Sequence, residues 1–229
     1  MKRRLFVIIT LLGCGGLFVL GQVKLAAHQP KAKLDVSNGV MAFLGGLRSI
    51  AAEVVWFRAD RLQEEGRFVE LVQLSNLLSH LDPYTPEVWS YAAWNLAYNV
   101  SVMMPTPEDR WRWVYAGICL LRDEALTVNP RSCELFRELA LMFEIKLGTD
   151  LDSAAATYRK EWRRMIEDVR ARDAWAELKM DVAKMKEIEA RTGFSDWTDP
   201  QLSAIYWALQ GGCQDILAQA AVLYRRRHN

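Results

Sequence analysis

Two asparagines in the run Trp94–Asn99, WNLAYN, are the side chains of this sequence best suited to binding another polypeptide. Asn95 and Asn99 are four residues apart, so on a helix they lie on one face, one turn from each other. Asparagine is unfavourable inside a helix, and its amide carries both a donor and an acceptor of hydrogen bonds. We therefore take both asparagines, with the aromatic residues Trp94 and Tyr98, as candidate partner-binding residues. The alternative is that the amides bond internally, to the 100–110 turn or to a neighbouring helix.

Arg58 is a further candidate, because it places a charge at a position where the surrounding helical pattern is apolar. It can pair with Asp60 or Glu87 of this chain, or with a carboxylate of a partner. We expect the internal ion pair, and we keep Arg58 among the partner-binding candidates.

Residues that support catalysis or bind metals are scattered along the chain. The histidines are His28, His80 and His228, and none has a cysteine or aspartate at ligand spacing. The sequence contains no glycine-rich phosphate loop and no GxSxG motif. Acidic pairs such as Glu64-Glu65 lie near basic residues and are typical of a solvated helix face. The sequence therefore predicts no enzyme activity, no metal site and no cofactor.

The cysteines leave two interpretations open. Cys14 lies in an apolar run, and the remaining Cys119, Cys133 and Cys213 are odd in number and form no CxxC motif. A disulfide such as Cys119–Cys133 is possible in an oxidising compartment. We favour the alternative, in which the three thiols are small buried hydrophobes.

The composition indicates a globular helical protein without a charged binding surface. Of the 229 residues, 51% are hydrophobic and 25% are charged, and the net charge is +1. Basic residues are interleaved with acidic ones, which argues against nucleic-acid binding. Alternating Val/Ile/Thr runs and Asn-Gly hairpin signals are missing, so we predict an all-α fold.

The first residues have the pattern of a membrane-targeting segment. A basic cluster at residues 2–4 precedes an apolar run over 5–23, about as long as the ~20 residues that span a bilayer. We expect an uncleaved signal anchor, a transmembrane helix at 1–24, followed by a linker at 25–41. A cleaved signal peptide and a lipoprotein signal at Cys14 are the alternatives. By the positive-inside rule the helical domain is then outside the cytoplasm, on the periplasmic side in a bacterium.

The stretch Gly66–Trp89 predicts a helix, a stop and a second helix. Its apolar residues recur at spacings of three and four, typical of one helix face: Phe68, Leu71, Leu74, Leu77, Leu78 and Leu81. Pro83 ends this helix, and Pro86 suits the first turn of the next one. Such a helix pair cannot bury its apolar face alone, so we expect further copies to stack on it.

The first unit and three further copies each have a small residue where two helices must approach closely. These residues are Ala59, Ala93, Ala140 and Ala204. With their apolar neighbours and turn residues, they give a pattern that resembles the tetratricopeptide-repeat family, whose helix-turn-helix units are about 34 residues long. The resemblance covers roughly Ala51–Arg227 and fails from Arg170 to Phe194. There the charge-rich pattern indicates one long amphipathic helix, or two helices with an unmarked break.

The resemblance implies an α-solenoid of three to four helix pairs. It divides the chain into TPR-like repeats at 42–169, an inserted long charged helix at 170–195 and a C-terminal helix pair at 196–229. It also implies a concave groove that binds peptides or partner proteins. In some repeats of this family, asparagines of the first helix hold the backbone of an extended peptide, which is the role implied for Asn95 and Asn99.

The expected function is a membrane-anchored, extracytoplasmic repeat scaffold that mediates protein–protein interaction in the cell envelope. Its expected partners are an envelope or membrane protein in the repeat groove and the membrane at the N-terminal helix, without nucleic acid or a small-molecule cofactor. The alternative is a structural subunit of a membrane transport or secretion complex.

Overall fold

The computed structural model describes the backbone of residues 36–228 and the side-chain surroundings of residues 50–74 and 77–228. Throughout these residues the regular structure is helical, without a β-strand, as predicted for the all-α class. Contacts divide the chain into two compact units, 1–47 and 48–229, and the second unit is described below.

The expected membrane anchor lies outside the described residues, as does most of the linker. In the part of the chain that the structure does describe, every helix is too short or too polar to cross a membrane.

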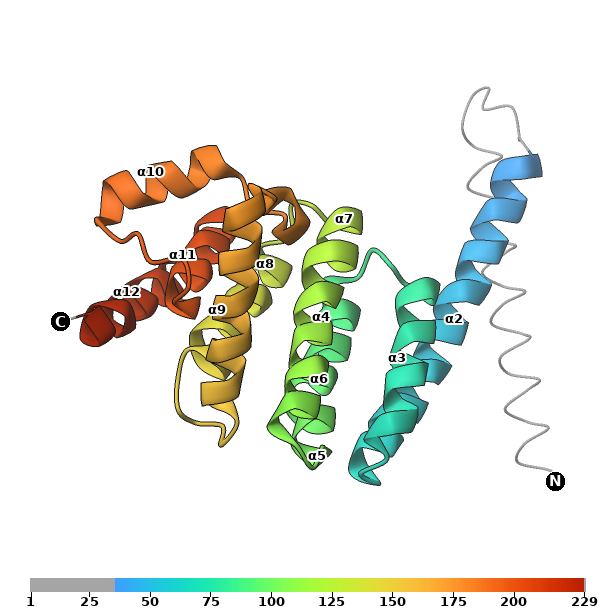
Figure 1. Ribbon diagram of the computed structural model, residues 1–229. Helices are drawn as coiled ribbons and strands as arrows, with labels where there is room; N and C mark the ends of the chain where they lie inside the picture. Colours follow the sequence, from blue (N-terminus) through green and yellow to red (C-terminus); the bar gives the residue numbers. More distant parts are fainter. Residues whose placement is uncertain (1–35, 229) are drawn as a thin grey trace, which may run out of the picture. The chain divides into compact units, whose positions relative to one another are not determined.

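Glycine and proline residues lie at helix ends of the second unit, as expected. Figure 1 shows the order of its helices. Helix α2 (Val36–Glu64) ends before Gly66, whose φ of 70° is a left-handed conformation that favours glycine. Helix α3 (Phe68–Leu81) ends just before the Asp-Pro pair, and α4 (Pro86–Trp94) begins with its proline in the first turn. The predicted helix, stop and second helix are therefore confirmed.

Three of the following helices each change into a π-helical segment, whose turns are wider than those of an α-helix. They are α4 continued by η1 (Asn95–Val100) and α5 (Ser101–Met103), α6 (Pro107–Cys119) continued by η2 (Leu120–Ala125) and α7 (Leu126–Val128), and α8 (Cys133–Leu141) continued by η3 (Met142–Leu147). The wide turns alter which side chains share a face, because they depart from the 3.6-residue period of a regular helix.

The charged segment at 170–195 is broken, so the single long helix expected there is wrong and the two-helix alternative is correct. The elements are α9 (Ala155–Arg172), the short 3₁₀ helix η4 (Trp175–Leu178) and α10 (Val182–Thr192). The breaks are at Asp173 and Lys179, whose φ values of 50° and 54° are left-handed. Between them Trp175 and Leu178 are buried, and this burial offsets the cost of the two strained residues.

The C-terminal part forms a helix pair, as expected for 196–229. Helix α11 (Pro200–Gly211) is capped at its N-terminus by Asp199, and α12 (Gln214–His228) follows a left-handed Gly212. Helix α11 packs against both α8 and α12, so it is central to this half of the unit.

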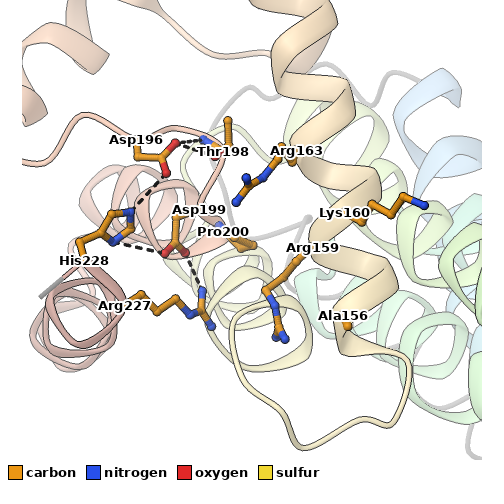
Figure 2. Close-up of a pocket in the computed structure, with 10 residues that line it drawn as sticks. All are labelled: Ala156, Arg159, Lys160, Arg163, Asp196, Thr198, Asp199, Pro200, Arg227 and His228. Atoms are coloured by element: carbon orange, nitrogen blue, oxygen red, sulfur yellow. Dashed lines mark hydrogen bonds and ion pairs between the residues drawn. The ribbon is translucent and has the colours of Figure 1, made fainter.

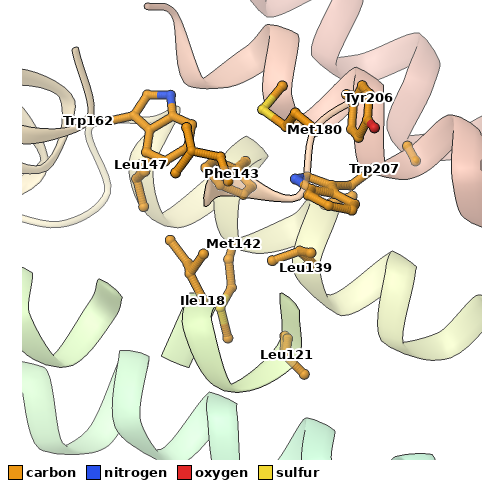
Figure 3. Close-up of a cluster of buried hydrophobic side chains, with 14 of the residues drawn as sticks. Ile118, Leu121, Leu139, Met142, Phe143, Leu147, Trp162, Met180, Tyr206 and Trp207 are labelled. Carbon is orange, nitrogen blue, oxygen red and sulfur yellow. The ribbon is translucent and has the colours of Figure 1, made fainter. Parts of the chain in front are cut away.

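One continuous apolar core extends from Trp89 to Tyr224 and joins the helices from α4 to α12. Figure 3 shows its centre, where Phe143 of η3 and Trp162 of α9 lie with ring centroids 4.7 Å apart. The first helix pair contributes two smaller clusters, centred on Leu78 and on Leu71. The core is thus largest towards the C-terminal half of the unit.

The alanines predicted at points of close helix approach are all fully buried: Ala59, Ala93, Ala140 and Ala204. Helices α4 and α6 approach closely at Ala93, because a Cβ added to Gly117 would lie 2.9 Å from the carbonyl oxygen of Ala93. The predicted packing role of these small residues is confirmed.

Candidate partner-binding site

The four candidates in the run Trp94–Asn99 differ in exposure, because Trp94 is exposed, Tyr98 and Asn99 are half-buried, and Asn95 is buried. Trp94 is partly exposed and stacks on Tyr98, with ring centroids 5.5 Å apart. Asn95 is only 1% exposed, and its Oδ1 accepts a hydrogen bond from Nδ2 of Asn99 at 3.0 Å. The two amides therefore bond each other rather than the 100–110 turn or a neighbouring helix, and Asn95 has too little accessible surface to contact a partner.

Tyr98 lines a pocket of about 480 Å³. The pocket lies between η1 and α5 on one side and η3 with its following loop on the other, and its lining residues are Tyr98, Val102, Arg110, Ile145, Lys146, Leu151, Asp152 and Ser153. Val102 and Leu151 form an apolar rim, with 48% and 82% of their surfaces exposed. The pocket therefore combines an aromatic wall with apolar groups that remain in contact with water.

The floor of the pocket is a buried ion pair. Lys146 is 5% exposed, and its Nζ donates a hydrogen bond to Oδ2 of Asp152 at 2.6 Å. The same ammonium lies 4.8 Å from the centroid of the Tyr98 ring, within range of a cation–π interaction. A buried lysine is stable only when it is paired, so Asp152 and Tyr98 together hold Lys146 in place.

Asp152 also fixes the loop that forms one wall. It accepts hydrogen bonds from the backbone N–H of Ala154 at 2.9 Å and from the hydroxyl of Tyr158 at 3.2 Å. Burial alone would raise the pKa of Asp152, but the hydrogen bonds from Lys146 and Ala154 outweigh it and the pKa is lowered. Asp152 is therefore ionised at neutral pH, and the loop has one defined position.

Tyr98 and Arg110 determine the charge at the mouth of the pocket. Burial raises the pKa of Tyr98 to about 12, so its hydroxyl is neutral at physiological pH. Arg110 donates to the carbonyl oxygen of Met104 at 3.0 Å and to the hydroxyl of Ser153 at 3.1 Å, and it lies 3.8 Å from Asp152. This arginine places a positively charged group at the mouth beside the apolar rim.

The lining contains no histidine and no cysteine, and its carboxylate is neutralised by Lys146. Throughout the described residues, no group of three or more His, Cys, Asp and Glu side chains is placed to hold a metal ion. What the geometry supports is binding: an apolar side chain against Tyr98 and a polar group at Arg110.

Arg58 does not belong to this pocket. It is exposed on α2 and forms no ion pair with Asp60, Glu87 or any other described residue. The expected internal pair is therefore wrong, since side chains two residues apart on a helix point to different faces.

The sequence reasoning missed Lys146, Asp152 and Arg110. A usable signal existed for Lys146, which is a charge inside the otherwise mostly apolar run Met142–Leu147. The sequence gives no comparable indication for Asp152, because the loop after η3 must fold back before Asp152 can contact Lys146.

The three described cysteines are free thiols, so the disulfide Cys119–Cys133 is not formed. Cys213 is buried, as favoured, whereas Cys119 is half-buried and Cys133 is exposed. The interpretation as small buried hydrophobes therefore holds for Cys213 alone.

Comparison with known proteins adds no assignment to the site. No model of a protein family matches this chain, and neither a curated protein nor a solved structure matches it significantly.

Proposed function

We propose that this chain is a membrane-anchored helical repeat scaffold, outside the cytoplasm, that binds a segment of another envelope protein at the Tyr98 pocket. The observation that carries the proposal is the exposed apolar rim of Val102 and Leu151 above a rigid floor. The apolar run near the N-terminus supports the anchor, and the helix-pair pattern supports the scaffold.

The pocket has the properties of an anchor site for one apolar side chain. Covering an exposed apolar side chain gains about 1.5–3 kcal/mol, and fully desolvated pockets of this kind carry most of the binding energy of an interface. The wall at 148–154 is held by Asp152, so little conformational entropy is lost on binding. Tyr98 and Lys146, which meet at 4.8 Å, both belong to π-helical segments, and such segments occur often at functional sites.

The charges at the mouth define the preferred partner. Arg110 favours a carboxylate next to the apolar anchor, because arginine forms strong charge-assisted hydrogen bonds with carboxylates. A lysine or arginine of the partner would be repelled there by Arg110 itself. A membrane anchor on the same chain would raise the local concentration of membrane partners.

A structural role in a larger membrane complex is the second candidate, and a different surface favours it. Large apolar side chains of α2 and α3 are exposed, among them Ile50, Val54, Phe57, Val69 and Leu77. An apolar surface of this kind is typical of a permanent interface. In that case the partner would cover α2 and α3 rather than the Tyr98 pocket.

Site-specific photocrosslinking in the full-length chain, in membranes of its native host, separates these candidates. A photoreactive phenylalanine analogue is placed at Leu151, at Phe57 or, as a control, at the exposed Val222 of α12. The proposal predicts one discrete adduct from Leu151 that the additional substitution Val102→Lys abolishes. An adduct from Phe57 alone favours the structural subunit, and equal labelling from all three positions contradicts both.

A further inference from the structure

We propose that a second pocket, between α9 and the ends of α11 and α12, binds a phosphate group. It has a volume of about 550 Å³ and is separate from the Tyr98 pocket. Arg159, Lys160 and Arg163 of α9 line one side, and Asp199, Arg227 and His228 line the other. Figure 2 shows the two arginines of α9 and the groups at the ends of α11 and α12 around this space.

The carboxylates of the pocket are already occupied by neighbouring donors. Asp199 Oδ1 accepts from the backbone N–H of Gln201 at 2.9 Å and from Arg227 at 2.7 Å. Asp196 Oδ1 accepts two hydrogen bonds from Thr198, and its Oδ2 lies 3.2 Å from Nε2 of His228. These contacts hold both aspartates, so their negative charge is compensated within the protein.

The cations of α9 are not compensated to the same degree. Arg163 and Lys160 are exposed and form no ion pair with any described residue. Arg159 donates to Oδ1 of Asp150 at 2.6 Å and to the carbonyl oxygen of Thr149 at 3.1 Å, which fixes its position. The pocket therefore has an excess of positive charge, with one guanidinium held in place and a second free to close on a ligand.

This arrangement matches the chemistry of a phosphate better than that of a single carboxylate. Arg159 and Arg163 are four residues apart on one helix, so both guanidinium groups reach the same space. Arg163 can form paired hydrogen bonds to two oxygens. Arg159, already bonded to Thr149 and Asp150, adds a fixed positive charge and its remaining N–H groups, and a phosphate offers enough oxygens for both. The pocket is larger than a phosphate ion needs, so the phosphate can be part of a soluble phosphomonoester or of a lipid headgroup.

Calorimetric titration of the full-length protein in neutral detergent tests this proposal. The probes are inorganic pyrophosphate, dihexanoyl phosphatidic acid and, as a lipid without net charge, dihexanoyl phosphatidylcholine. The test variant is Arg163→Gln. The matched control is Arg170→Gln, which removes an exposed, unpaired arginine of the same helix outside the pocket.

We expect Arg163→Gln to weaken binding of a phosphate probe at least tenfold, while Arg170→Gln changes it less than twofold. Tighter binding of pyrophosphate identifies a soluble ligand, and tighter binding of phosphatidic acid identifies a lipid headgroup. Failure of both phosphate probes to bind would overturn the proposal. Equal weakening by both variants would overturn it too, as would binding of phosphatidylcholine as tight as that of phosphatidic acid. Because the Tyr98 pocket takes no part, crosslinking at Leu151 stays unaffected by Arg163→Gln if the two sites are independent.

Discussion

Gln201 donates a hydrogen bond from its side-chain amide to the carbonyl oxygen of Gly148, with a distance of 3.0 Å across 53 residues of sequence. The same nitrogen donates to the carbonyl oxygen of Glu144 at 2.9 Å. Arg227 donates to the Gly148 oxygen as well. The end of η3, the start of α11 and the end of α12 therefore meet at one backbone carbonyl.

Replacing Gln201 with alanine removes a fully buried donor and leaves the Glu144 carbonyl short of a partner. We expect a loss of about 2–3 kcal/mol in the free energy of unfolding, measured by urea titration of the full-length chain. The control is Gln210→Ala on the same helix, where the side chain bonds to Lys184 at the surface and the loss should stay below about 0.5 kcal/mol. Equal effects of the two substitutions would contradict the bridging role of Gln201.

Gly148→Ala should be among the most destabilising small substitutions in the chain. An added Cβ would lie 2.1 Å from Nε2 of Gln201 and 2.3 Å from the carbonyl oxygen of Glu144. We expect a loss of about 3 kcal/mol, since the helix end and α11 must separate. Gly66→Ala is the comparison, because Gly66 has open space around its Cα and only its φ of 70° opposes alanine. Its cost should be about 1 kcal/mol, and a larger loss at Gly66 than at Gly148 would refute the contact argument.

The carboxyl group of Asp152 should make the free energy of unfolding depend on pH in the acidic range. Its pKa is lowered in the folded state, so the stabilisation is complete above the unfolded pKa of about 3.9 and is lost as the pH falls through the folded value. At pH 7 we expect Asp152→Asn to cost about 3 kcal/mol, because Lys146 is left buried without its carboxylate. Thermal unfolding from pH 7 to pH 3 should show the difference between wild type and variant shrinking below about pH 4.

The control for this pH dependence is Asp150→Asn in the same loop. Asp150 pairs with Arg159, but its side chain is largely exposed, so solvent screens the ion pair. This variant should unfold at nearly the wild-type temperature at every pH. A constant offset between wild type and Asp152→Asn over the whole range would show that the carboxyl group does not titrate as expected.

The three described thiols should react in the order of their exposure. Cys133 is exposed, whereas burial raises the pKa of both Cys119 and Cys213, so fewer reactive thiolates form there. Timed alkylation with N-ethylmaleimide and peptide mass spectrometry should find Cys133 modified at least tenfold faster. A peptide containing a Cys119–Cys133 disulfide in unreduced protein would contradict the free-thiol state.

Most of the fold that could be predicted from sequence depended on glycine and proline residues at helix boundaries. Gly66 and Pro86 determine a helix end and a helix start through backbone conformation, and local chemistry of that kind is visible in sequence. The break between α9 and α10 was not marked, because Asp173 and Lys179 adopt left-handed conformations that only the packing of Trp175 and Leu178 explains.

The sequence predicted only part of the candidate binding site, because tertiary contacts place the other residues. Tyr98 was identified, and it lines the pocket. Asn95 and Asn99 share a helix face, as their spacing predicts, and bond each other; which face is buried depends on the neighbouring helices, and Asn95 lies on the buried side. Asp152 contributes because the loop after η3 folds back and places its carboxylate beside Lys146. A tertiary contact of this kind leaves no local sequence pattern.

The wide turn next to Tyr98 also sets the rotational phase of the pocket wall. A π-helical turn spans one residue more than an α-helical turn. Deleting one residue from Asn95–Val100 would let the helix return to regular geometry with its hydrogen bonds intact. Because the wide turn had absorbed the extra residue, the segment Ser101–Met103 would keep nearly the same rotational position about the helix axis, and Val102 would stay at the pocket. A single-residue deletion at this turn would thus retain both the helix and the apolar rim, whereas the same deletion in the regular α-helix Pro86–Trp94 would rotate all that follows by about 100°.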